Sequence, residues 1–450
     1  MLEGLEISEV NYSFLNNDLR IDAEYFGKEL LKDIGVLNQY GVMQISSIAN
    51  VTDGIHTSID YDDNSNVNLI SATSPKDNVF DLSRRVFISE KSHKLNPRTA
   101  LKVNDVVIST VGTVGNCAVV DNSILPANTD RHVGIIRIKD KYSPYALSTF
   151  MVSKYGRMQS LRESTGNVQL NLFIYKLKEL LIPNFDICFQ NKIEQIVKDA
   201  HATLSKSKRL YSESIKFLFD ILGLQNWHPI DNQSNVKFIK ESFLVSGRLD
   251  AEHYQMKYDE LEDIIKSVPY KTIAELNSFN ARGVQPNYIE GGDVSVVNSK
   301  HILEDGLDYD NFEHTTTDFL SLNKRAQIGY GDILIYTTGA NIGRTQVYLR
   351  NDYALASNHV NILRVKGVNP LYLALVLNSK IGRLQTAKFS TGSAQAELYP
   401  YDIDRFIVPI LPTSIQDHIA SKIQESFTLR AESRRLLDEA KRMVEMEIEK

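Results

Sequence analysis

Hydrophobic and polar positions along the chain follow two patterns. Short β-branched runs separated by Asn, Asp, Gly and Ser predict strands and turns. Two apolar stripes of helical period follow a proline suited to a first helical turn, and they predict helices from Pro144 to Met158 and from Pro370 to Leu384. The fold class is therefore α+β. The predicted strands are Val67–Ile70, Val103–Ile108, Val133–Ile138, Val294–Val297, Ile333–Tyr336 and Val360–Val365.

The longest apolar pattern has the 4-3 spacing of a coiled-coil seam, and it occurs twice. Serines and Arg430 interrupt both seams, so neither helix is expected to be stable alone in water. Each helix either packs on its own domain or pairs with the other in an antiparallel coiled coil, and we expect the pairing. Thr413 with Gln416 predicts a capping box at the start of the second helix. The seam residues are Ile193, Val197, Leu204, Tyr211 and Leu218, and then Ile419, Ile423, Leu437 and Val444.

A stretch in the first half of the chain returns in the second half, about 227 positions later and in the same order. Four blocks in one order are hard to produce by chance. They predict two copies of one unit, whose different loops suggest a protein that reads two different things. The repeated blocks are Arg20–Phe26 with Arg248–Tyr254, Asp105–Gly112 with Asp332–Gly339, Thr165–Gln169 with Thr391–Gln395, and Pro183 and Gln190 with Pro409 and Gln416.

Composition sets outer bounds. With 450 residues and 42% hydrophobic content the chain is an ordinary folded protein. Its apolar runs are too short to cross a bilayer, and its first residues are acidic where a secretory signal is positive, so we expect a cytoplasmic protein. Cys117 and Cys188 are the only cysteines, which excludes a disulfide framework and a cysteine-rich zinc site. We expect both to be buried as small apolar residues.

Catalytic signatures are nearly absent. The sequence has no Gly-rich loop followed by Lys-Ser/Thr, no His-Glu-x-x-His and no Gly-x-Ser-x-Gly. One histidine recurs in both units, as His132 in the first and His359 in the second. A structural hydrogen-bonding role is favoured for it over a catalytic one. Trp227 is expected to pack at the junction formed by the linker Gly223–Pro229.

Features that could bind nucleic acid are more prominent. In both units a strand ends in hydroxyls and two glycines, a turn that can present N–H and hydroxyl groups to phosphates. The alternative is a tight turn whose glycines only satisfy a positive φ. A net charge of −6 argues only weakly against nucleic acid, because local Lys and Arg residues decide selective binding. The candidate DNA contacts are Arg84, Arg85, Lys91, Lys94, Arg98, Thr110, Asn116, Gln169, Lys324, Arg325, Thr337, Arg344, Lys388 and Gln395.

These features together resemble a specificity subunit of a type I restriction-modification system. The resemblance is carried by the repeat, the strand-Thr-x-Gly turns, the Thr-Gly-x-x-Gln segments, and the Ile-Pro or Val-Pro step before each long helix. It implies two target-recognition domains and two long spacer helices that form an antiparallel coiled coil. The expected bounds are 1–184 for the first domain, 185–228 for the first spacer helix and linker, 229–411 for the second domain and 412–450 for the second spacer helix.

The resemblance also implies a non-catalytic role in reading a bipartite target in double-stranded DNA. Two methyltransferase subunits and endonuclease/translocase subunits would be the protein partners. S-adenosylmethionine, ATP and magnesium would be bound by those partners, with no cofactor in this chain and no membrane involved. A related type II system with a fused methyltransferase-nuclease is the nearest alternative. A duplicated scaffold or carbohydrate-binding protein and a duplicated hydrolase are the alternatives from other classes.

Overall fold

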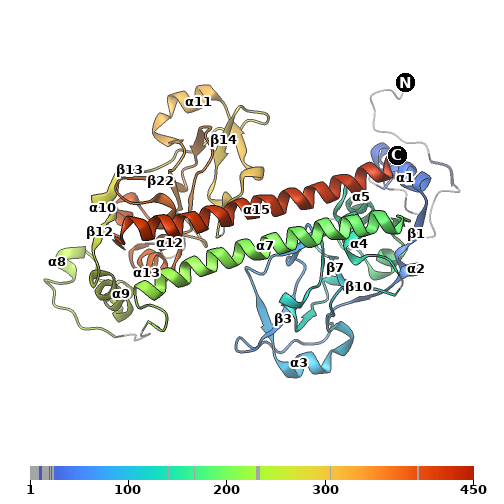
Figure 1. Ribbon diagram of the computed structural model, residues 1–450, viewed down its shortest axis with the longest axis horizontal. Coiled ribbons are helices and arrows are strands. Elements are labelled where there is room, and N and C mark those ends of the chain that lie inside the picture. The colour runs from blue at the N-terminus through green and yellow to red at the C-terminus, as the bar shows by residue number, and fades with distance from the viewer. Residues whose placement is uncertain are drawn as a thin grey trace. The chain divides into compact units, whose positions relative to one another are not determined.

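The computed structural model describes residues 10–12, 20, 22, 25–139, 141–166, 168–229, 234–304, 306–392 and 395–450. These residues form two compact units of mixed helix and sheet (Figure 1). Unit 1 comprises Met1–Leu204 with Ala431–Lys450, and unit 2 comprises Ser205–Arg430. Parts of two of the repeated blocks lie outside the described residues, namely Ile21, Ala23, Glu24, Asn167, Ser393 and Ala394.

Unit 1 is built on a four-stranded antiparallel sheet with the order β2-β10-β7-β8. A second sheet has the order β6-β3-β9, and its β3 and β9 run parallel. Two short pairs, β1-β11 and β4-β5, complete the strands. The strands are β1 (Val42–Gln44), β2 (Ala49–Asp53), β3 (Val67–Ile70), β4 (Pro75–Lys76), β5 (Val79–Phe80), β6 (Val86–Ile88), β7 (Val106–Ser109), β8 (Cys117–Val119), β9 (Ala127–Thr129), β10 (Val133–Ile138) and β11 (Leu181–Pro183).

Helices cover the four-stranded sheet of unit 1, and their apolar side chains form its main core with those of the strands. Tyr145, Phe150 and Met151 of α4 contribute to this core, as do Val106 and Ile108 of β7. The helices are α1 (Lys28–Tyr40), α2 (Ile45–Ile48), α3 (Glu90–Leu95), α4 (Pro144–Val152), α5 (Lys154–Arg162) and α6 (Ile174–Glu179).

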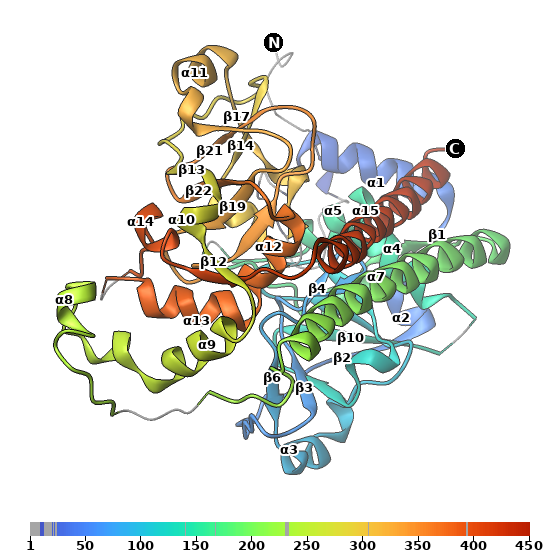
Figure 2. The same ribbon diagram turned by 60° about the vertical axis from the view of Figure 1, so that its left-hand side comes forward.

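Unit 2 repeats this plan. Its main sheet has the order β13-β22-β19-β20, and its second sheet, β17-β14-β21-β18, again contains a parallel pair, β14 and β21. The strands are β12 (Tyr270–Thr272), β13 (Asn277–Arg282), β14 (Val294–Val297), β15 (Ile302–Leu303), β16 (Gly306–Leu307), β17 (Glu313–Thr315), β18 (Gln327–Ile328), β19 (Ile333–Tyr336), β20 (Thr345–Val347), β21 (Ala354–Ala356), β22 (Val360–Val365) and β23 (Ile407–Pro409). The helices are α8 (Phe243–Ser246), α9 (Met256–Lys266), α10 (Ile273–Leu276), α11 (Thr317–Leu322), α12 (Pro370–Asn378), α13 (Lys380–Phe389) and α14 (Pro400–Ile403), several of which are prominent in Figure 2.

Two long helices, α7 (Ile187–Ile221) and α15 (Thr413–Ile448), each contribute one part to each unit. In unit 2 they pair through serines: Ser207 Oγ donates to the Ser426 carbonyl oxygen at 2.7 Å, and Ser426 Oγ donates to that of Ser207 at 2.8 Å. Glu213, further along α7, meets Lys422, which lies earlier on α15, so the two segments are antiparallel. Small serines let the two backbones approach closely.

The same helices pair in unit 1 through their other segments. Ser433 Oγ donates to the Ala200 carbonyl oxygen at 2.7 Å, and Ile193 and Val197 share the unit 1 core with Ala440 and Val444. The expected fold class, two α+β domains with a pair of long antiparallel helices, is confirmed. Of the predicted seam, Ile193, Val197, Leu218, Ile419, Ile423 and Val444 are buried, and Leu204, Tyr211 and Leu437 are half-buried.

Five of the six predicted strands have the predicted bounds. The sixth, predicted from Val103 to Ile108, runs from Val106 to Ser109. The predicted helix at Pro144 was wrong in its length. The chain breaks at Ser153, whose extended backbone and side-chain bond to the Phe150 carbonyl oxygen end α4, and α5 follows. The helix at Pro370 breaks in the same way at Ser379. The apolar pattern continues across both breaks, so periodicity alone could not show them.

Two further expectations need correction. Gln416 does not close a capping box with Thr413, because its side chain accepts from the Asn369 N–H at 2.9 Å and donates to the Leu411 carbonyl oxygen at 2.8 Å. Gln190 makes the equivalent bonds in unit 1. Cys117 is buried as expected, but Cys188 is exposed in the first turn of α7.

Within the described ranges, no helix combines the length and the apolar character that a bilayer crossing requires.

Candidate nucleic-acid interface

In unit 1 the glycine turn after β7 and the Thr-Gly-x-x-Gln segment after α5 form one backbone-joined loop pair. The Gly112 N–H donates to the Leu170 carbonyl oxygen at 3.0 Å, and the Leu172 N–H donates to that of Thr110 at 2.8 Å. Thr165 and Asn171 exchange two further backbone bonds, of 3.0 and 2.8 Å, which close the second loop on itself. Two segments far apart in the sequence therefore form one rigid surface element.

Unit 2 contains the same loop pair. The Gly339 N–H donates to the Ala396 carbonyl oxygen at 3.0 Å, and the Leu398 N–H donates to that of Thr337 at 2.9 Å. Thr391 and Glu397 exchange bonds of 2.9 and 2.7 Å. The repeated blocks of the sequence are thus brought together in both units, by equivalent bonds.

A glutamine side chain lies over the glycine turn of each loop pair. Gly112 and Gly339 have positive φ values, 74° and 109°. A Cβ placed on either glycine would lie 3.6 Å from the Gln169 Nε2 or 3.7 Å from the Gln395 Nε2. Both glutamines are exposed, so each presents an amide with two donors and an acceptor, the groups that read the edge of an adenine.

The hydroxyls predicted to face phosphates serve the turn instead. Thr337 Oγ1 donates to the His359 carbonyl oxygen at 3.0 Å, and Thr110 is 4% exposed. The N–H groups of Thr110 and Thr337 also bond to the carbonyl oxygens of His132 and His359. Both threonines and both histidines therefore hold the turn in place. Asn116 and Arg344, at the far end of each turn, are half-buried.

The basic residues of unit 1 that were predicted to contact DNA lie around α3, away from the loop pair in sequence. Arg84 and Arg85 precede β6, and Lys91 is on α3; all three are exposed, and among the described residues none has an ion-pair partner. Lys94 forms an exposed ion pair with Glu90 at 3.2 Å. Such exposed pairs contribute little to stability, so Lys94 can exchange its partner at low cost.

Arg98 is held more firmly. Its guanidinium donates to Asp53 Oδ1 at 2.8 Å, to the Gly54 carbonyl oxygen at 3.1 Å and also to Thr52. Burial alone would raise the pKa of Asp53, but the hydrogen bonds from Arg98 and His56 lower it below its ordinary value. Arg98 therefore fixes the start of the loop that follows β2.

In unit 2 the basic residues divide into two groups. Lys324 and Arg325 follow α11, are exposed and have no ion-pair partner within the described part of the chain. Lys388 lies on α13 with 14% of its side chain exposed, and its Nζ is 2.5 Å from Glu262 Oε1. Burial would raise the pKa of Glu262, and the charges of Lys388 and Lys266 lower it overall. Glu262 therefore neutralises the positive charge of Lys388 within unit 2.

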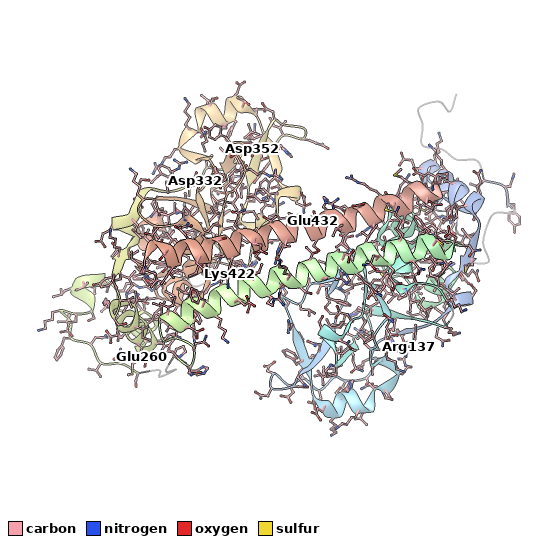
Figure 3. The ribbon with its side chains drawn as sticks, viewed as in Figure 1. Arg137, Glu260, Asp332, Asp352, Lys422 and Glu432 are labelled. Carbon is pink, nitrogen blue, oxygen red and sulfur yellow. The ribbon has the colours of Figure 1, made fainter. Side chains whose placement is uncertain are left out.

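Two ion pairs, each of a buried aspartate and a partly exposed arginine, support the main sheets, and the sequence analysis had not singled them out. Arg137 Nη2 lies 2.7 Å from Asp105 Oδ2, and Arg364 Nε lies 2.8 Å from Asp332 Oδ1. Figure 3 labels one member of each pair, Arg137 and Asp332. Arg137 also donates to the Ala100 carbonyl oxygen, and Arg364 donates to that of Gln327. The arginine and the aspartate both recur in the second unit, so an alignment of the two repeats could have identified these ion pairs.

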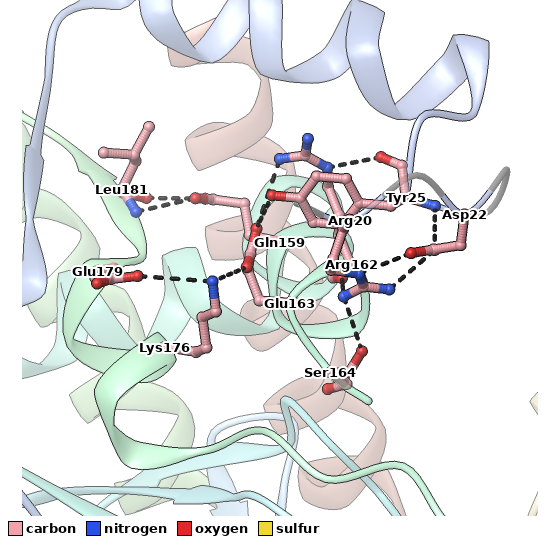
Figure 4. A network of polar contacts seen from close by, with 10 residues as sticks. All are labelled: Arg20, Asp22, Tyr25, Gln159, Arg162, Glu163, Ser164, Lys176, Glu179 and Leu181. Carbon is pink, nitrogen blue, oxygen red and sulfur yellow. Dashed lines mark hydrogen bonds and ion pairs between the residues drawn. The ribbon is translucent and has the colours of Figure 1, made fainter. Parts of the chain in front are cut away.

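A polar network anchors the base of the second loop in unit 1 (Figure 4). The Tyr25 ring lies between two guanidinium groups, 4.5 Å from Arg20 and 3.7 Å from Arg162, and its hydroxyl donates to Glu163 Oε1 at 2.9 Å. Burial first, and then Glu163, raise the pKa of Tyr25 to about 12. Arg20 also donates to the Ser164 carbonyl oxygen, next to the loop.

Unit 2 has an equivalent arginine, Arg248, but a histidine replaces the tyrosine. Arg248 pairs with Asp250 at 2.6 Å and donates to the carbonyl oxygens of Lys388 and Phe389. His253 takes the place of the tyrosine, and its Nδ1 lies 2.8 Å from the Lys388 carbonyl oxygen. The repeated Arg-x-Asp block therefore ties the start of each unit to the helix that leads into its loop.

Comparison with known proteins gives a family match to a segment that lies mostly in unit 2. Residues 260–441 match the family model described as type I restriction modification DNA specificity domain. No curated protein matches the sequence. Among solved structures, the type I restriction-modification S subunit from M. genitalium is 12% identical, with 91% of this chain and 94% of that chain covered and a TM-score of 0.44. The HsdS subunit from Thermoanaerobacter tengcongensis is 12% identical, with 90% and 95% covered and a TM-score of 0.28.

The matched segment holds the main sheet, the Arg364–Asp332 pair and the loop pair of unit 2. Unit 1 repeats the strand order, the Arg–Asp pair and the loop pair. Residues 260–441 therefore match the type I restriction modification DNA specificity domain, and unit 1 repeats the structural features of the matched segment.

Proposed function

We propose that this chain reads a bipartite target in double-stranded DNA, with the loop pair of each unit placed over one half-site. The observation that carries the proposal is the backbone-joined loop pair, which occurs in both units with an exposed glutamine over a positive-φ glycine. A rigid turn with one free amide suits direct readout of a base edge, since glutamine can pair bidentately with adenine. In this reading Gln169 and Gln395 contact bases.

The predicted contact residues take different roles in this proposal. Exposed cations without ion-pair partners among the described residues are suited to phosphates, because neutralising phosphate charge releases counterions. Lys94 joins them by exchanging Glu90 for DNA. Residues already engaged or partly buried support the loops that contact DNA. The phosphate group is Arg84, Arg85, Lys91, Lys94, Lys324 and Arg325, and the supporting group is Arg98, Thr110, Asn116, Thr337, Arg344 and Lys388.

The proposal includes partners in the cytoplasm. Two methyltransferase subunits would bind this chain, and endonuclease/translocase subunits would join them. S-adenosylmethionine, ATP and magnesium would be bound by those subunits. The domain bounds 1–184, 185–228, 229–411 and 412–450 belong to the same proposal, with the first and third segments reading DNA.

The long helices would set the gap between the half-sites. Support comes from the register of their pairing, which places Ser207 against Ser426 in unit 2 and Ser433 against Ala200 in unit 1. Seven residues added to α7 after Leu204 and to α15 after Arg430 preserve the heptad phase. Such an insertion should lengthen the gap and leave both half-site sequences unchanged.

Methylation sequencing tests the whole proposal. A host expressing this chain with the methyltransferase encoded beside it should show one bipartite methylated motif, and the chain carrying both insertions should show the same half-sites further apart. A host without the chain is the control. Altered half-sites with an unchanged gap would contradict the role of the helices, and the absence of any methylated motif would contradict the proposed function.

A further inference from the structure

Each unit carries two stacked aromatic rings on its surface. In unit 1 the rings of Phe173 and Tyr175 have centroids 5.9 Å apart and planes 17° apart. In unit 2 the rings of Tyr399 and Tyr401 have centroids 5.5 Å apart and planes 7° apart. The two ring pairs occupy equivalent places in the repeat, directly after the second loop of each loop pair. We call them the aromatic pairs.

Local backbone geometry builds both pairs in the same way. Phe173 and Tyr399 are the N-cap residues of α6 and α14, and both have extended backbones, with ψ values of 147° and 158°. The residues before them, Leu172 and Leu398, are fully buried and fix the chain at this point. A ring at the N-cap and a ring two residues later then face the same way and stack. The pairs are therefore preformed.

The aromatic pairs cover no core of their own unit. Phe173 is 45% exposed, Tyr175 is 54% exposed and Tyr401 is 61% exposed, while Tyr399 is half-buried under the guanidinium of Arg282, 4.4 Å from its ring centroid. Exposed rings in one place usually mark a contact surface, because burying them on binding is favourable and costs little side-chain entropy. Because the ring pairs are duplicated, a partner that binds them would be bound once by each unit.

The nature of that partner follows from what differs between the units and from the local charge. The exposed basic segments differ between the copies, whereas the aromatic pairs recur, so the pairs serve a task common to both half-sites. Their surroundings hold no excess of positive charge. In unit 1 Lys176 is paired with Glu163 and Glu179, and the exposed Lys178 lies beside them. In unit 2 Arg282 lies over the Tyr399 ring and 3.9 Å from Glu397, and the buried Asp402 lies within three residues of Tyr399. Phosphate binding needs such an excess, so an apolar protein surface is the better match.

We propose that the aromatic pairs are two equivalent docking sites for a protein subunit that presents an apolar surface and binds one copy per unit. This inference rests on the proposed function, which supplies the methyltransferase subunit as the partner that occurs twice. Each pair acts as a central aromatic anchor of its interface, a position where truncation commonly weakens binding by about 30-fold or more.

The test uses the full chain and the purified methyltransferase subunit encoded beside it. The variants are Phe173→Ser with Tyr175→Ala for unit 1, and Tyr399→Ser with Tyr401→Ala for unit 2. Serine is a preferred N-cap residue and alanine a good helix former, so the short helices keep their local support. Tyr61→Ser in unit 1 and Tyr353→Ser in unit 2 are matched controls, since these tyrosines are 61% and 62% exposed and belong to neither pair. Circular dichroism melting confirms that each variant folds.

Titration calorimetry should give two methyltransferase subunits per wild-type chain. The unit 2 variant should keep one tight site and weaken the other by at least about 30-fold, the unit 1 variant should do the same, and the controls should match wild type. Two unchanged tight sites in both variants would overturn the inference and leave the proposed function standing. Weakened binding to duplex DNA measured without the methyltransferase, with unchanged methyltransferase binding, would instead assign the pairs to DNA. No binding to the wild-type chain would overturn both proposals.

Discussion

The two units differ least where they are buried and most where they meet solvent. Both have the same main-sheet order, the same Arg–Asp pair and the same backbone-joined loops. In contrast, the exposed cations of unit 1 lie before β6 and on α3, whereas those of unit 2 follow α11. The comparison shows that the main sheet, the Arg–Asp pair and the joined loops form a frame common to both units. The exposed segments outside this common frame differ between the units. The proposed reading of two different half-sites requires this division.

The strongest test of the common frame is the close contact between paired helices. A Cβ on Gly382 would overlap the Leu377 carbonyl oxygen, and one on Gly156 would overlap the Phe150 carbonyl oxygen, both in the preceding helix. Gly382→Ala and Gly156→Ala should therefore each destabilise the chain by about 3 kcal/mol. Urea unfolding followed by circular dichroism measures the effect. The control is Gly35→Ala within α1, where no atom lies within 4 Å of the added Cβ.

Gly35→Ala should be neutral or should stabilise by up to about 1 kcal/mol, since alanine is the better helix former. Equal effects at Gly35 and Gly382 would contradict the close packing of α12 on α13. A large effect in one unit only would show that the frame is not common to both.

The Arg–Asp pairs should give the next largest effect. Arg364→Met leaves Asp332, whose side chain is 7% exposed, without its cation, and Arg137→Met does the same to Asp105, at 3% exposed. A buried carboxylate without its partner is costly, but both arginines are partly exposed, so we expect about 2 kcal/mol for each. Arg325→Met, at an exposed position, is the matched control and should stay within about 0.5 kcal/mol. Thermal unfolding measures the midpoint of each variant. Equal midpoints for all three would show that neither Arg–Asp pair stabilises its unit.

The loop pairs test the division of labour between the units. Gln395→Ala removes one amide from unit 2 and should relax a single base position in one half-site by about 1–3 kcal/mol of discrimination, with the other half-site unchanged. Gln169→Ala should relax the opposite half-site. Methylation sequencing of hosts expressing each variant reads both half-sites at once, and Gln195→Ala, an exposed glutamine on α7, is the control. Relaxation of both half-sites by one variant would contradict the assignment of one loop pair to each half-site.

Sequence patterns anticipated much of this frame and little of the site. β-branched runs gave the bounds of strands such as Val133–Ile138 and Val360–Val365, because a strand is encoded by its own residues. The predictions missed the breaks at Ser153 and Ser379, because the apolar pattern runs through them, whereas the helices end where these serines bond to the Phe150 and Val376 carbonyl oxygens. The joining of the two loops depends on bonds between residues far apart in the chain, such as Gly112 with Leu170. The repeat identified which segments mattered without showing how they meet.

The smallest expected effect concerns the residues at the start of each unit, Tyr25 in unit 1 and His253 in unit 2, and is a difference in the pH dependence of stability. Burial lowers the pKa of His253, and the charges of Arg248 and Lys388 lower it further, against the bond to the Lys388 carbonyl oxygen. A histidine whose folded pKa lies below its unfolded value of about 6.5 contributes stability that is complete above that pH and is lost as the pH falls through the folded pKa. Tyr25, the equivalent residue of unit 1, has a pKa raised to about 12 and does not titrate in this range. His253→Tyr should therefore reduce the fall in unfolding free energy between pH 7 and pH 5. Urea unfolding at several pH values measures this, with the exposed His228→Tyr as control. If His253→Tyr and the wild type lost the same stability over this range, the neutral histidine would not be part of the anchor, and the two units would be alike at this site as well.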